Sequence, residues 1–149
     1  MTEVLFYHLE RQPLERVLPE LLEKCLERGW RAVVQVSSEE RLEAIDAHLW
    51  TYRDEAFLPH ATQKDGAPEG QPIWLTTEDD NPNRANVRFL ADGAEAADVA
   101  AYQRVVMLFD GTDPDAVLAA RDSWKKMKAD GHEATYWQQS ERGRWEKKA

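Results

Sequence analysis

The chain has 149 residues, of which 42% are hydrophobic and six are tryptophan, and this is enough apolar material for one folded domain. The formal net charge of −9 argues against the broad basic surface that nucleic-acid-binding domains carry. Since no apolar run approaches the roughly 20 residues that span a bilayer, we expect a globular protein that binds neither nucleic acid nor membrane directly.

Short apolar runs and helical patterns alternate along the chain. The first predicted elements are a strand at 4–9, a helix at 13–28, a strand at 30–36 and a helix that Ser37 or Ser38 caps. An irregular segment at 52–72 is followed by strands at 73–76, 87–90 and 104–109, with a short Ala-rich helix at 94–102. Asp113 and Pro114 then begin a basic helix that Gly131 ends, and residues 133–138 are expected to add a strand.

This alternation predicts a single Rossmann-like α/β domain over residues 1–139, in which a mainly parallel sheet has helices on both faces. Residues 140–149 are polar, and we expect them to form a frayed C-terminal tail. The nucleotide-binding loop of such folds is missing, since the first strand is followed by His8-Leu9-Glu10-Arg11-Gln12-Pro13, without glycine. We therefore expect no bound cofactor.

Catalytic and metal-binding patterns are also missing from the sequence. The four histidines do not have the spacing of metal ligands, and the serines at 37 and 38 lie in no nucleophile elbow. The single cysteine, Cys25, falls on the apolar side of the first predicted helix and is expected to be a core residue. The N-terminus does not have the basic start and cleavage site of a signal peptide. These observations predict a cytoplasmic, non-catalytic protein.

The basic helix differs in charge from the rest of the chain, because residues 111–149 carry a net charge of +1 and residues 1–110 carry −10. At about 100° per residue, Arg121, Lys125 and Lys128 fall within about 60° of one another on this helix. Val117 and Trp124 lie beside that stripe. An edge with cations and apolar surface suits an acidic peptide that ends in an apolar residue and a free carboxylate.

Simpler explanations of the same residues stay open. Trp124 shares a helix face with Ala120 and Met127, as a core residue does, and the lysines fit a solvated face near a helix C-terminus. Trp50 and Phe57 either close the edge of the core or line an exposed groove. Two other functions also stay open: an adaptor that binds a partner through its acidic surface, and an enzyme acting on a nucleotide or another small molecule.

Seven segments, taken in order, resemble the chi subunit of bacterial DNA polymerase III, and together they span nearly the whole chain. They are Phe6-Tyr7-His8, His48-Leu49-Trp50, Phe57-Leu58-Pro59-His60, Asp80-Asn81-Pro82-Asn83, Phe109-Asp110-Gly111, Ala120-Arg121-Asp122-Ser123-Trp124-Lys125 and Ala134-Thr135-Tyr136-Trp137-Gln138-Gln139. The resemblance implies a Rossmann-like fold that has no nucleotide site and is not catalytic. It also implies binding to the acidic C-terminal tail of single-stranded DNA-binding protein and, in many bacteria, to the psi subunit, which joins chi to the clamp loader.

The resemblance also implies roles for individual residues. Arg121, Trp124 and Lys125 match the basic-aromatic helix with which the family receives the tail. Val117 stands where some members have a further lysine, so Lys128 is expected to supply that charge. Trp50 and Phe57 match family positions near the same region and are expected to line the pocket with Val117.

Overall fold

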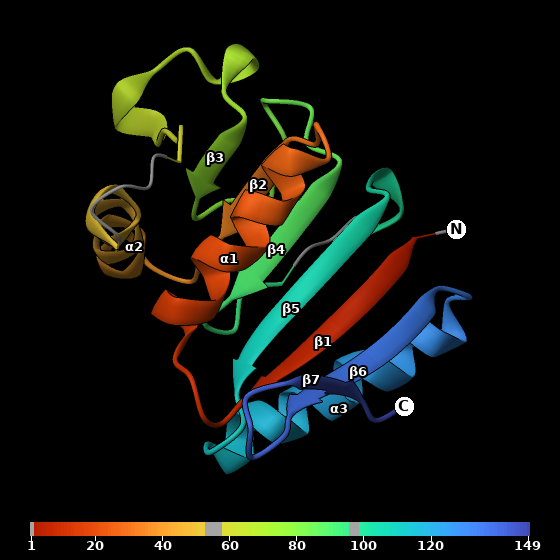
Figure 1. Ribbon diagram of the computed structural model, residues 1–149. Helices are drawn as coiled ribbons and strands as arrows, with labels where there is room; N and C mark the ends of the chain where they lie inside the picture. Colours follow the sequence, from red (N-terminus) through yellow and green to blue (C-terminus); the bar gives the residue numbers. More distant parts are fainter. Residues whose placement is uncertain (1, 53–57, 96–98) are drawn as a thin grey trace.

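The computed structural model describes residues 2–52, 58–95 and 99–149, and its centre is a twisted sheet (Figure 1). The strands are β1 (Glu3–Leu9), β2 (Ala32–Gln35), β3 (Ile73–Thr76), β4 (Val87–Ala91), β5 (Arg104–Asp110), β6 (Glu133–Gln139) and β7 (Trp145–Lys147). Their order across the seven-stranded sheet is β3-β2-β4-β5-β1-β6-β7. All neighbouring strands are parallel except β6 and β7, which confirms the predicted mainly parallel sheet.

Helices cover both faces of the sheet, as the sequence predicts (Figure 1). On one face, α1 (Leu14–Glu27) and α2 (Glu39–Thr51) bury their apolar sides against the strands. Cys25 belongs to that core, and burial raises the pKa of its thiol to about 11. On the other face, α3 (Pro114–Ala129) lies behind β1 and β6 in Figure 1 and buries Ala120 and Met127. The fold therefore places α3 on the opposite side of the sheet from α1 and α2.

Local sequence signals fix the ends of the helices. The side chain of Ser38 caps α2 by accepting a hydrogen bond from the Arg41 amide at 3.2 Å. Asp113 caps α3 through the Asp115 amide at 3.0 Å, and Pro114 takes the first helical position. Gly131 follows α3 with a φ of 85°, a conformation that suits glycine. The predicted limits of the basic helix are confirmed.

Two segments differ from the sequence-based expectation. A helix at 94–102 is wrong for the described residues of that stretch, where only a 3₁₀ turn at Val99–Ala101 forms, and residues 96–98 lie outside the described part. Ala94, Val99 and Tyr102 are buried in the core, so tertiary packing overrides the helix propensity of alanine. Within 140–149, where the sequence predicts a frayed tail, β7 pairs with β6 and Trp145 contacts Tyr7.

The connection between α2 and β3 contains short 3₁₀ turns at Gln63–Asp65 and Pro68–Gly70, while residues 53–57 lie outside the described part. Among the helices that the structure describes, none has the length and the apolar composition to cross a membrane.

Candidate functional site

The candidate site is the outer edge of α3, where the sequence places cations beside an aromatic ring. Ala120 and Met127 turn toward the sheet and are buried, whereas Arg121, Lys125 and Lys128 are exposed. Helical geometry explains this division, because residues spaced by three or four positions share one face. The structure therefore brings the three predicted cations together on the solvent side of α3.

Trp124 lies between the core and the cations and is half-buried. Its ring meets Phe6 of β1 edge-on, with centroids 5.6 Å apart, and meets Tyr136 of β6 at 6.1 Å. On the outer side, the Nζ of Lys128 lies 5.0 Å from the centroid of the Trp124 ring, within the range of a cation–π contact. Trp124 is thus a core residue on one side and a partner of the cations on the other.

Aromatic side chains from three strands continue the apolar surface next to Trp124. Tyr136 contacts Phe109 with ring centroids 5.9 Å apart, and its hydroxyl lies 2.6 Å from Nδ1 of His8. Burial raises the pKa of Tyr136, while the nearby charge of Arg121 acts in the opposite direction. The hydroxyl is therefore protonated at neutral pH.

Sequence reasoning did not assign these aromatic residues to the site. The parallel register aligns Phe6 with Tyr136 and His8 with Phe109, although these positions are far apart in the sequence. Alternation within one strand predicts which of its residues lie on the same face of a sheet. Only the strand order shows that residues of different strands lie next to one another on that face. The segments that carry the family resemblance include these residues, but the resemblance does not show that they lie side by side.

The cations of α3 have no acidic neighbour within ion-pair distance in the part of the chain that the structure describes. Basic side chains elsewhere do: Arg41 pairs with Glu15 and Asp92, and Lys64 pairs with Glu43. The salt bridges of the described residues include neither Arg121 nor Lys125 nor Lys128. Their charges are therefore available to an anionic ligand.

The pocket-lining residues that the sequence proposed do not all lie here. Val117 is half-buried on α3, one turn before Arg121 and two turns before Trp124. Trp50 lies at the end of α2 and is 50% exposed, and its ring lies tilted against that of His60 with centroids 4.2 Å apart. Because α2 packs near β3 and α3 packs on the opposite face near β1 and β6, Trp50 is not beside the cations. Phe57 lies outside the described residues.

The expectation that Trp50 lies near the cations is wrong, because an aromatic residue in a helix does not indicate which face of the sheet that helix covers. That face depends on the direction of each crossover connection. Among the described residues, histidine, cysteine, aspartate and glutamate form no group of three or more able to hold a metal ion.

Comparison with known proteins identifies similar sequences. A family model described as DNA polymerase III chi subunit, HolC, matches residues 1–135, from the N-terminus into β6. A curated protein of Rickettsia prowazekii (strain Madrid E), named probable DNA polymerase III subunit chi, is 28% identical over 109 residues. The aligned part covers 73% of this chain and 66% of that relative, which is just under two thirds of its length. Both findings agree with the resemblance seen in the sequence.

Proposed function

This chain belongs to the DNA polymerase III chi subunit family, whose members are accessory subunits of the replication machinery, and we propose that α3 binds the acidic C-terminal tail of single-stranded DNA-binding protein. Arg121 and one lysine hold the terminal carboxylate of the tail. Trp124 packs against the last, apolar side chain, and the remaining lysine attracts acidic residues upstream. The chain thereby links single-stranded DNA-binding protein to the clamp loader.

One observation carries this proposal: exposed cations without carboxylate partners among the described residues lie along one side of a half-buried indole on α3. A guanidinium can hold a carboxylate with two parallel hydrogen bonds, and a lysine adds a point charge. Because each exposed charge pair contributes about 0.2 to 1 kcal/mol, the affinity should be modest and should fall as salt is added.

The remaining parts of the proposal follow from charge and from the family. The chain acts without catalysis, in the reducing cytoplasm, and reaches the clamp loader through psi where that subunit exists. It does not contact DNA itself, because its net charge of −9 repels phosphate everywhere except at the stripe on α3.

The test is a fluorescence-anisotropy titration of a labelled tail peptide with the full chain and with variants of α3. Arg121→Ala removes a charge-assisted hydrogen bond, so we expect it to weaken binding about tenfold. Lys125→Glu should weaken binding more than Lys125→Ala, because its carboxylate repels the peptide. Lys126→Glu is the matched control, since it changes the net charge equally and lies about 140° around the helix from Arg121.

We expect the control to bind within about twofold of the parent, because long-range charge effects are weak at physiological salt. If Arg121→Ala and Lys125→Glu bind like the parent, the tail site lies elsewhere. Retention of a replication partner by those same variants would then favour an adaptor that acts through its acidic surface.

A further inference from the structure

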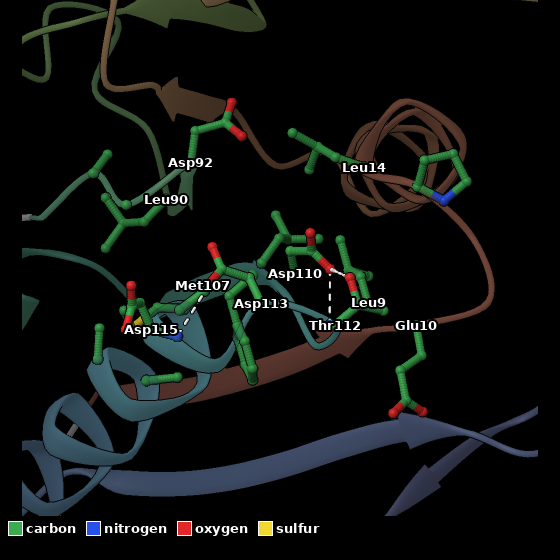
Figure 2. A pocket seen from close by; sticks show the side chains of 18 of the residues that line it. Leu9, Glu10, Leu14, Leu90, Asp92, Met107, Asp110, Thr112, Asp113 and Asp115 are labelled. Carbon is green, nitrogen blue, oxygen red and sulfur yellow. Dashed lines mark hydrogen bonds between the residues drawn. The ribbon is translucent and has the colours of Figure 1, made fainter.

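A cleft of about 860 Å³ opens at the carboxyl ends of β1, β4 and β5, beside the start of α3 (Figure 2). By helical geometry, the α3 residues that line it lie on the opposite side of the helix from the cations. The cleft lies between the loop that leads into α1 and the first half of α3. Rossmann-like folds bind ligands at this place, where neighbouring crossovers leave the sheet in opposite directions. None of the residues proposed above for the acidic tail lines this cleft.

The floor of the cleft is apolar. The ends of the strands contribute Leu9, Leu90 and Met107, and α3 contributes Ala116 and Ala119. Two of these, Leu90 and Met107, stand side by side in Figure 2, below Asp92 and beside the start of α3. The short alanine side chains leave the helix wall flat, so an extended segment with apolar side chains has space to lie against it.

The rim of the cleft is acidic. The described residues that line it include seven carboxylates and two arginines. One of the arginines, Arg41, is already paired with Glu15 and Asp92 at 2.9 and 2.8 Å. Glu95 and Asp115, by contrast, take part in none of the salt bridges among the described residues.

Local hydrogen bonds keep two of the rim carboxylates charged. The hydroxyl and the amide of Thr112 donate to Asp110 and lower the pKa of that carboxyl group. A hydrogen bond from Gln138, together with the His8 ring 3.3 Å away, likewise lowers the pKa of Glu10. The rim is therefore negative at neutral pH. A phosphate would be repelled here, and residues 8–13 have no glycine loop to hold one.

We propose that this cleft binds a basic segment of a partner protein, in which apolar side chains alternate with lysine or arginine. The apolar side chains lie on the floor and the cations face the acidic rim. On α3, Ala116, Ala119 and Ser123 line the cleft, whereas Arg121 and Lys125 lie well over 90° around the helix axis from them. The two flanks of α3 thus select ligands of opposite charge, and both can be occupied at once.

The experiment uses short, labelled peptides with blocked ends, titrated into the full chain and followed by fluorescence anisotropy. The probe alternates leucine with lysine, and its comparison peptides alternate serine with lysine and leucine with glutamate. We expect the leucine–lysine peptide to bind at least about fivefold more tightly than either comparison peptide. Only this peptide has both apolar side chains for the floor and cations for the acidic rim.

Variants locate the binding. Glu95→Gln with Asp115→Asn should weaken the leucine–lysine peptide about fivefold. Glu20→Gln with Glu27→Gln, an equal charge change on exposed positions of α1, should leave its binding unchanged. Ala119→Phe, which fills the cleft, should also weaken it. Equal losses in the two double variants, or unchanged binding by Ala119→Phe, would overturn the proposal.

The acidic tail peptide serves as the second readout for the same variants. Its binding should not change, because none of the substitutions touches the cation stripe of α3. The two proposals can therefore be tested separately, because loss of binding to one peptide leaves binding to the other peptide measurable.

Discussion

Trp124 shows how one side chain can serve both the fold and the site. Its contacts with Phe6 and Tyr136 hold α3 to the sheet, while its outer edge lies under Lys128. From the sequence, a core residue and a binding residue were alternatives. In the structure, one side of the ring packs against Phe6 and Tyr136, and the other side faces Lys128.

Trp124→Ala should therefore weaken both stability and tail binding. Loss of a packed indole costs about 3 kcal/mol, near the lower end for core tryptophans because this ring is half-buried. Urea denaturation and the tail-peptide titration measure the two effects. Arg121→Ala is the control, since an exposed residue should change the free energy of unfolding by less than about 0.5 kcal/mol. An unchanged denaturation midpoint for Trp124→Ala would contradict the contacts described here.

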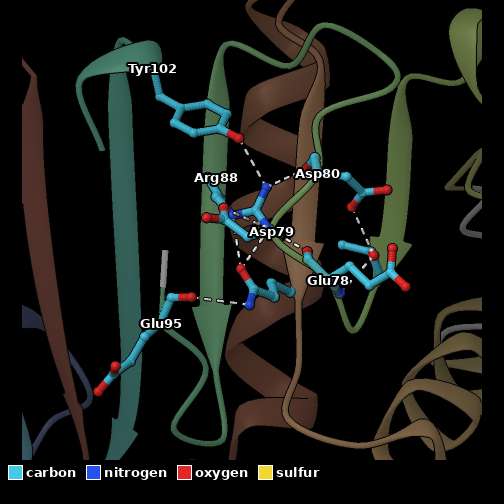
Figure 3. Close-up of polar contacts among 8 residues, drawn as sticks. Glu78, Asp79, Asp80, Arg88, Glu95 and Tyr102 are labelled. Carbon is cyan, nitrogen blue, oxygen red and sulfur yellow. Dashed lines mark hydrogen bonds and ion pairs between the residues drawn. The ribbon is translucent and has the colours of Figure 1, made fainter. Parts of the chain in front are cut away.

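Arg88 is a buried cation that the sequence analysis did not single out (Figure 3). It lies in the middle of β4 with no exposed surface and donates hydrogen bonds to the Gln35 side chain and the Tyr102 hydroxyl. It also donates to the backbone carbonyls of Glu78 and Asp80 at 2.7 and 2.6 Å. Arg88 thus ties the loop after β3 to the half of the sheet that α3 does not cover.

Arg88→Met should lower the free energy of unfolding by about 3 kcal/mol or more, because each buried acceptor left without a donor costs about 1 to 3 kcal/mol. Tail-peptide affinity should stay at the parent value, since β4 does not contact the cation stripe. Chemical denaturation followed by the peptide titration tests both statements. A variant as stable as the parent would show that these hydrogen bonds are not needed.

At the scale of elements, the turn between β5 and α3 sets where the helix begins. Gly111 passes directly over the His8 ring, and a Cβ at this position would lie 2.1 Å from Nε2 of that histidine. The Gly111 amide also donates to the Leu9 carbonyl at 2.7 Å. The start of α3 is therefore fitted closely against the end of β1.

Gly111→Ala should cost about 1 to 3 kcal/mol, as overpacking of a filled site does. Gly70→Ala is the matched control, because a Cβ at Gly70 would meet nothing within 4 Å and its φ is not in the left-handed region. Thermal unfolding of both variants makes the comparison. Equal melting temperatures for the two would show that the turn relaxes freely around the added methyl group.

Most elements were predictable because their local signals agree with the tertiary structure. Leu42, Ile45 and Leu49 mark the buried face of α2, and all three are buried. The absence of a helix in the described residues of 94–102 and the pairing of β7 were not predictable, since both depend on contacts with distant strands. The cations of α3 were found from spacing within one helix. The aromatic neighbours, Tyr136 and Phe109, needed the strand order, and so did the exclusion of Trp50.

For the whole molecule, the uneven distribution of charge predicts binding to an acidic peptide and no direct binding to DNA. At physiological salt, the purified chain should not bind a single-stranded oligonucleotide, because its acidic surface repels phosphate. It should join a complex of that oligonucleotide with single-stranded DNA-binding protein, through the tail. Native gel shifts and anisotropy with labelled oligonucleotide test both halves. Micromolar binding to the bare oligonucleotide would contradict this account.

We propose that Arg121, Lys125 and Trp124 together recognise the end of an acidic peptide. The most direct measurement is a titration of the full chain with the tail peptide, with the peptide lacking its last apolar residue, and with the peptide lacking one upstream acidic residue. Loss of the last residue should weaken binding about tenfold or more, because the end of the peptide meets both the cations and the indole. Loss of one upstream acid should cost at most about 1 kcal/mol. Equal losses from the two deletions would show diffuse charge attraction and would contradict the claim.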